Sequence, residues 1–88
     1  MNVKLNIMNL KNALSKYVTV SPDILGGTPV FKNTRVPIKI LIDYLQGGEN
    51  IQEFLENYPT VKKSFAQKVL ELLAVYVIEI ETDNGAAA

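Results

Sequence analysis

The strongest constraint on the fold is a stretch rich in proline and glycine at residues 21–37, which reads SPDILGGTPVFKNTRVP. Proline is excluded from the interior of helices and of central strands, and adjacent glycines favour turns. Three of the four prolines of the chain fall in this stretch, so neither a long helix nor a long strand can cross it. It therefore predicts turns around one short strand at residues 30–31.

The residue types also predict how these turns form. Ser21 can cap a single helical turn that has Pro22 at its first position and Gly26 just past its end. Asparagine tolerates positive φ, so a second turn is expected at Asn33. The residues expected to shape the turns are Gly26, Gly27, Asn33, Thr34, Arg35 and Pro37.

Residues 17–20 (YVTV) are β-branched and aromatic, which is typical of a strand. We expect this segment to pair with residues 29–32 across the intervening turn. A two-stranded ribbon alone is barely stable, so it must lie on helices or pair with a second copy. Residues 2–7 alternate between polar and apolar side chains, which fits either a strand or a frayed terminus. Residues 9–16 are expected to form either a short helix or an irregular segment.

Everything after residue 37 is predicted to be helical. Apolar residues recur with helical spacing over residues 37–46, 51–57 and 60–77. Asn50 and Glu53 are placed for a capping box at the second of these helices, and Thr60 is the expected N-cap of the third. Residues 72–78 are apolar all round, which favours contact with another chain. The alternative is that the β-branched residues from Val75 onward form a strand.

The 88 residues are expected to form one α+β domain, a short N-terminal β-ribbon followed by a three-helix, helix-turn-helix-like bundle. We divide the chain into an N-terminal extension (1–16), the helix-turn-helix domain (17–78) and an acidic, disordered tail (79–88). Apolar residues make up 48% of the chain, which favours a partner or dimer surface in addition to a core. No apolar run is long enough for a membrane span, and no secretory leader is evident, so the expected location is cytoplasmic.

The spacing between the second and third helices matches a helix-turn-helix unit. In such a unit the start of the later helix enters the DNA major groove, where lysines suit phosphates and Ser or Gln can read bases. Most helix pairs with this spacing are plain bundles, and lysines on one helix are usually a solvated face. The candidate DNA-binding residues are Thr60, Lys62, Lys63, Ser64, Gln67 and Lys68.

Composition argues against an enzyme. The chain has no cysteine and no histidine, which removes thiol chemistry, the commonest general base and the commonest metal ligand. No paired-carboxylate motif or phosphate loop is present, and we expect no cofactor and no metal. The Arg35 guanidinium is expected to hydrogen-bond to backbone carbonyls or to pair with an acid such as Asp23 or Asp43. The alternative is that it contacts a phosphate or an acidic side chain of a partner.

The block at residues 22–38 resembles the signature of the bacterial family known as domain of unknown function 433. That signature reads approximately Pro-Asp-Ile-x-Gly-Gly-x-Pro-Val-Ile-x-Gly-Thr-Arg-Ile-Pro-Val. The similarity continues through residues 41–48 (LIDYLQGG) and 51–59 (IQEFLENYP). Asn33 replaces the family's glycine, but both residues tolerate positive φ. Lys62 and Lys63 stand where the family usually has acids.

The resemblance implies an antitoxin that is encoded beside a nuclease toxin with a PIN-like fold. It would neutralise the toxin and bind its own operator DNA. We expect a homodimer, because the ribbon edges and the apolar end of the last helix both need to be covered. No catalytic residues come with the resemblance. The apolar end of the last helix is the expected toxin-binding surface, through Leu73, Val77, Ile78 and Ile80. The alternative function is a protein-interaction module that does not bind DNA, which the net charge of zero favours.

Overall fold

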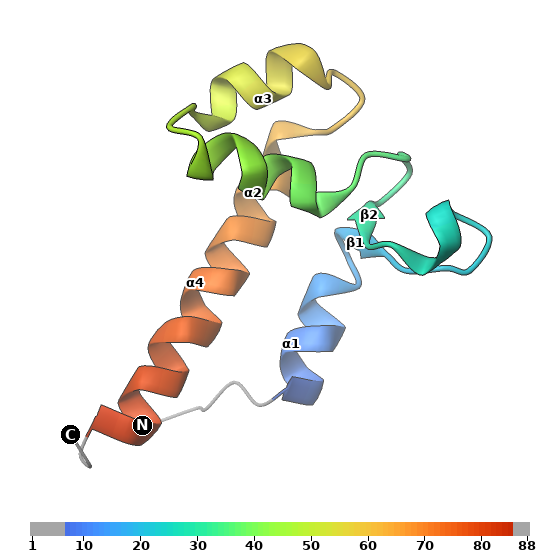
Figure 1. The fold of residues 1–88 in the computed structure, drawn as a ribbon. Coiled ribbons are helices and arrows are strands. Elements are labelled where there is room, and N and C mark those ends of the chain that lie inside the picture. The colour runs from blue at the N-terminus through green and yellow to red at the C-terminus, as the bar shows by residue number, and fades with distance from the viewer. Residues whose placement is uncertain (1–6, 86–88) are drawn as a thin grey trace.

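The computed structural model describes the backbone of residues 7–85 and the side chains of residues 9–78. Figure 1 shows the elements in chain order: α1 (Ile7–Leu14), β1 (Val18–Thr19), the 3-10 turn η1 (Leu25–Gly27), β2 (Val30–Phe31), α2 (Ile38–Gln46), α3 (Ile51–Asn57) and α4 (Lys63–Gly85). The predicted α+β class, a short β-ribbon followed by three helices, is confirmed. The predicted strand at residues 2–7 lies outside the described residues except for Ile7, which begins α1.

The predicted ribbon forms as an antiparallel pair of β1 and β2, with Val18 opposite Phe31 and Thr19 opposite Val30. The N–H of Lys32 extends the pairing by donating to the carbonyl of Tyr17 at 2.8 Å. The other edge of β2 is covered by the chain that leads into α2. Phe31 N–H donates to the Val36 carbonyl at 2.9 Å, and Ile38 N–H donates to the Pro29 carbonyl at 3.0 Å.

The turns follow the predicted chemistry with one correction. Asn33 has φ 66°, as expected for its left-handed turn. Thr34 Oγ1 donates to the Phe31 carbonyl at 2.8 Å and accepts from Val36 N–H at 3.0 Å, which holds that turn. The Ser21 hydroxyl accepts from Asp23 N–H at 3.2 Å. Gly26 lies inside η1 with φ 65° rather than just past the end of a helical turn, because Leu25, with φ 48°, already leaves the right-handed region.

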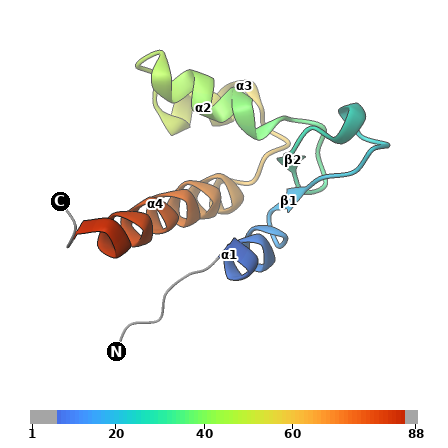
Figure 2. The same ribbon diagram turned by 60° about the horizontal axis from the view of Figure 1, so that its bottom comes forward.

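The core joins the ribbon to the three later helices. Six buried side chains form its centre: Phe31, Leu41, Phe54, Val61, Ala66 and Val69. The Phe54 ring contacts the Phe31 ring at 5.8 Å and the Tyr58 ring at 5.2 Å between centroids. Both views show α2 and α3 paired at one end, while α1 lies beside the long α4 (Figures 1 and 2).

Helix α4 corrects four expectations. It begins at Lys63 and not at Thr60, because Val61 turns into the core after its N–H bonds to the Tyr58 carbonyl at 3.1 Å. It continues to Gly85, so the predicted end near residue 77 and the strand alternative are wrong. Residues 79–85 are therefore helical, although a disordered tail was expected from residue 79. No helix within the described residues is long and apolar enough to cross a membrane.

Candidate functional site

The six candidate DNA-binding residues gather at the start of α4. Phe65, Ala66 and Val69 face inward there, and the Phe65 ring meets the Tyr17 ring of the ribbon edge-on at 5.2 Å between centroids. The opposite face of the helix is therefore presented to solvent. It carries Lys63, Ser64, Gln67 and Lys68, with Thr60 and Lys62 in the preceding linker, and all six are exposed.

The lysines of this surface differ in their surroundings. The Lys62 ammonium lies 5.4 Å from the centre of the Phe65 ring, which holds it near the first turn. Lys68 Nζ donates to Glu71 Oε1 at 2.9 Å. That hydrogen bond, together with the carboxylate charge, raises the pKa of Lys68 above its ordinary value. Lys63 pairs with no residue in the part of the chain that the structure describes.

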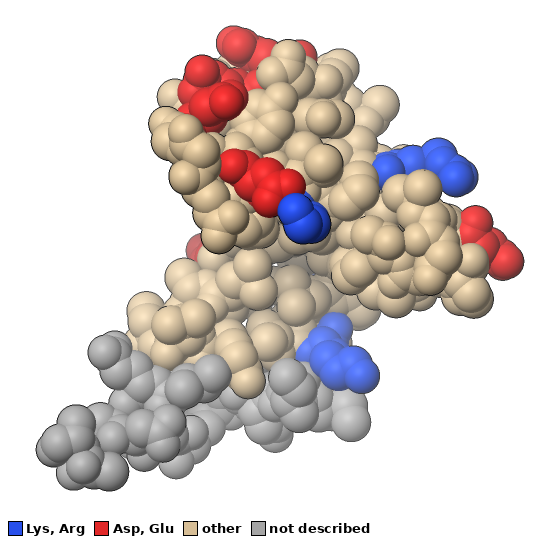
Figure 3. Space-filling view, in the orientation of Figure 1, with Lys and Arg blue, Asp and Glu red and all other residues tan. Residues whose placement is uncertain are grey.

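Acidic side chains mark a different part of the molecule. Figure 3 shows most of the visible acidic side chains over the α2–α3 end, with one red cluster at the right edge of this face. Asp43 of α2 and Glu53 of α3 belong to that end. Lys39 places one positive charge among these acids, because its Nζ pairs with Asp43 Oδ2 at 2.8 Å. The charge asymmetry makes the lysine-bearing start of α4, and not the α2–α3 end, the surface suited to a polyanion.

Arg35 does not have the structural role that was expected. Its side chain is exposed and makes no hydrogen bond or ion pair with any described residue. Asp43, one of its expected partners, is instead paired with Lys39 at 2.8 Å. The other, Asp23, is exposed and has no ion pair among the described residues. A charged group that is not used within the fold is available for a phosphate or for a partner's acid.

The apolar end of α4 is partly a core element and partly an open surface. Leu73 is half-buried and packs against the core, which leaves only part of its side chain accessible to a partner. Val77 and Ile78 are 62% and 57% exposed, as a docking surface requires. The side chain of Ile80 lies outside the described residues. Val75, which is 39% exposed, lies three residues before Ile78 and so on the same side of the helix as Ile78. In the sequence it only indicated a possible strand.

The described residues contain no group of three or more Asp, Glu, His or Cys side chains that could hold a metal ion. No charged or polar residue among them is buried. The groups that these surfaces expose are ammonium and guanidinium groups, hydroxyl and amide groups, and valine and isoleucine side chains.

Comparisons with known proteins place this geometry in a family. Residues 18–72 match a family model described as "Protein of unknown function (DUF433)". The uncharacterized protein y4eO of Sinorhizobium fredii is 39% identical over 64 residues, and the match covers 73% of this chain and 27% of that protein. The fold is similar to the crystal structure of a DUF433 member from Anabaena variabilis, with a TM-score of 0.60 and 25% identity. That similarity covers 86% of this chain and 75% of the other.

Proposed function

This chain belongs to the DUF433 family, and we propose that it is the antitoxin of a type II toxin–antitoxin system that binds its operator DNA as a dimer and neutralises a PIN-like nuclease. The observation that carries the proposal is the cluster of exposed lysines and hydrogen-bonding side chains on one face at the start of α4. Because such a protein acts on intracellular DNA, the expected location is the cytoplasm.

The arrangement at α3 and α4 suits a duplex. The short helix α3 is joined by a brief linker to α4, whose first turns carry Lys63, Ser64 and Gln67 on the exposed face. Lysines would bind phosphates, while the serine hydroxyl and glutamine amide would read base edges. Lys62, which the Phe65 ring holds near this face, would add a further phosphate contact.

The toxin would dock on the far end of the same helix. Val75, Val77 and Ile78 expose apolar area there that the fold does not need. Val75 lies about two helical turns beyond Lys68, so toxin and DNA would bind different parts of α4. A metal-dependent nuclease has an acidic active site, and residues 79–83 of this chain are themselves rich in acids. We therefore propose that the chain docks beside the nuclease site and does not plug it.

A second candidate function is a protein-interaction module that does not bind DNA. Two observations favour it: the chain has a formal net charge of zero, and Glu71 neutralises Lys68 in the middle of the lysine face. In this case the apolar end of α4 would be the principal functional surface.

Titration against DNA separates the two functions. The purified chain is titrated with the duplex from upstream of its own gene and with a scrambled duplex, at several salt concentrations. The antitoxin proposal expects preference for the native sequence and an affinity that falls steeply with salt, because each phosphate contact releases counterions. Weak binding without sequence preference, lost at physiological salt, would favour the interaction module.

A further inference from the structure

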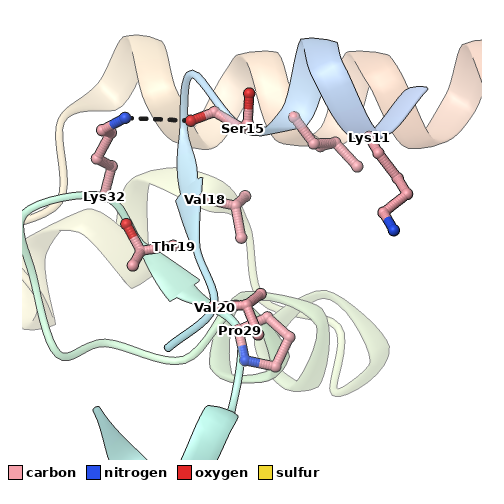
Figure 4. A pocket seen from close by; sticks show the side chains of 8 residues that line it. Lys11, Ser15, Val18, Thr19, Val20, Pro29 and Lys32 are labelled. Carbon is pink, nitrogen blue, oxygen red and sulfur yellow. Dashed lines mark hydrogen bonds between the residues drawn. The ribbon is translucent and has the colours of Figure 1, made fainter. Parts of the chain in front are cut away.

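An open groove of about 580 Å³ lies between α1 and the β-ribbon, and no function proposed above uses it. Eight residues line it: Lys11, Leu14, Ser15, Val18, Thr19, Val20, Pro29 and Lys32. Its walls are mostly apolar, and Val20 is 64% exposed within it. Figure 4 shows Val20 and Pro29 adjacent to each other at one end of the groove. The volume is that of a typical binding site.

The groove runs along a free strand edge. Val18, Thr19 and Val20 are consecutive and all line it. Successive side chains of a strand point to opposite faces of the sheet. A groove on one face of the ribbon would therefore be lined by every second residue, whereas a groove lined by three consecutive residues lies along the edge of β1.

The hydrogen-bond pattern shows which backbone groups that edge offers. Phe31 donates its N–H away from β1, to Val36, so Phe31 and Val18 are a pair that exchanges no hydrogen bonds. The N–H and carbonyl of Val18 must then point to the outer edge of β1. No described group bonds to either of them. An unpaired edge of this kind accepts an added strand.

The charges of the groove select the occupant. Its two charged lining residues are both lysines, and no acid lines it. Lys32 Nζ donates only to the Ser15 carbonyl, at 3.2 Å, and Lys11 has no partner among the described residues. Figure 4 shows the two ammonium groups on opposite sides of β1. Two copies of the chain joined edge to edge would bring these lysines toward each other, which disfavours a second copy as the occupant.

We propose that this groove binds an extended, acidic segment of a partner protein, which pairs with the outer edge of β1 as an additional strand. Its backbone bonds to the N–H and carbonyl of Val18. Its apolar side chains rest on Leu14, Val20 and Pro29, and its carboxylates meet Lys11 and Lys32. The groove shares no residue with the DNA-binding face or with the toxin-binding end of α4, so this proposal does not depend on the proposed function.

The test uses a short synthetic peptide of alternating valine and glutamate, added to the ¹⁵N-labelled full chain and followed by NMR. We expect saturable binding with shifts confined to α1, β1 and the residues around Pro29. Methylating the alternate peptide nitrogens that would face β1 should abolish binding, because the strand hydrogen bonds are lost. A peptide with lysine in place of glutamate should bind roughly tenfold more weakly, because its charges oppose those of the groove.

Two variants of the chain locate the site. Lys11→Glu should weaken binding of the valine–glutamate peptide about fivefold, at the upper end of what exposed charge pairs contribute. Lys39→Glu makes the same change in net charge on α2, outside the groove, and should change the affinity less than about twofold. Lys39 is exposed, so its loss leaves the core intact.

Three outcomes would overturn the proposal. The first is the absence of saturable peptide binding, and the second is equal binding of the N-methylated peptide. The third concerns a second copy: if sedimentation shows a dimer that Val20→Glu converts to a monomer, the groove is an interface between copies of this chain.

Discussion

Lys68 Nζ lies 2.9 Å from Glu71 Oε1, one turn further along α4, in the middle of the proposed DNA-binding face. The carboxylate raises the pKa of Lys68, so the lysine stays charged over any pH range in which DNA is bound. At the same time Glu71 places a negative charge where phosphates would approach. The pair therefore limits the affinity of this face for DNA without removing its positive charge.

Replacing Glu71 with glutamine should strengthen DNA binding. The change removes a carboxylate from the face and releases the Lys68 ammonium, so we expect roughly a twofold to fivefold higher affinity, as for other exposed charge pairs. The salt dependence should steepen by about one phosphate contact. Fluorescence anisotropy with the upstream duplex measures both the affinity and its salt dependence. Glu56→Gln on α3 makes the same charge change away from this face and is the control. An unchanged affinity for Glu71→Gln would place the DNA elsewhere.

The double charge reversal Lys62→Glu/Lys63→Glu should abolish sequence-specific binding at physiological salt. Each lysine is expected to supply about one phosphate contact, so any residual binding should have a salt slope smaller by about two. Binding of the partner nuclease should persist, because both residues are exposed and remote from the end of α4. Lys11→Glu/Lys16→Glu carries the same charge change on and after α1 and should retain DNA binding. If the Lys62/Lys63 variant binds DNA with unchanged affinity, the start of α4 is not the DNA-binding face.

The double substitution Val77→Glu/Ile78→Glu should remove neutralisation of the nuclease and leave DNA binding intact. Both side chains are more than half exposed, so their replacement should change the free energy of unfolding by less than about 0.5 kcal/mol per site. Co-purification with the proposed nuclease partner, and inhibition of that nuclease, measure the effect. Leu45→Glu, which alters an exposed apolar residue of α2, is the matched control. Full inhibition by the Val77/Ile78 variant would show that toxin contacts lie elsewhere.

Local sequence rules predicted the elements whose hydrogen bonds are short-range. Asn50 and Glu53 form the expected capping box, with both bonds at 2.9 Å. The turn at Asn33 and the pairing of β1 with β2 also follow from residue type and spacing. Neighbouring residues alone decide the cap and the turn, whereas β1 and β2 pair across the intervening turn because residues 17–20 and 29–32 both favour strands.

Tertiary contacts decided what the sequence could not predict. Helix α4 starts at Lys63 because Val61 is drawn into the core, which outweighs the capping preference of Thr60. Asp43 is not the partner of Arg35, because Lys39 binds it from one turn away on the same helix. Leu73 and Val77 belong to one apolar segment, and packing leaves Leu73 half-buried against the core while Val77 is 62% exposed.

The capping box of α3 gives a prediction about stability. Asn50→Ala removes the side-chain oxygen that accepts from Glu53 N–H, so the free energy of unfolding should fall by about 1 kcal/mol. Urea denaturation followed by circular dichroism measures this as a lower midpoint with an unchanged m-value. Gln52→Ala, on the same helix but outside the box, should change stability by less than about 0.5 kcal/mol. Equal effects of the two substitutions would show that the cap contributes nothing measurable.

Asn33 gives the clearest test of a backbone effect, because its side chain is exposed and has no hydrogen bond among the described residues. Its φ of 66° is strained for alanine but not for glycine. We expect Asn33→Ala to lower the free energy of unfolding by about 1 kcal/mol, whereas Asn33→Gly should stay within about 0.5 kcal/mol of the parent. Chemical denaturation of the parent, Asn33→Ala and Asn33→Gly proteins under one set of conditions measures these differences in the free energy of unfolding. If alanine and glycine behave alike, left-handed backbone strain does not explain why asparagine and the family's glycine alternate at this turn.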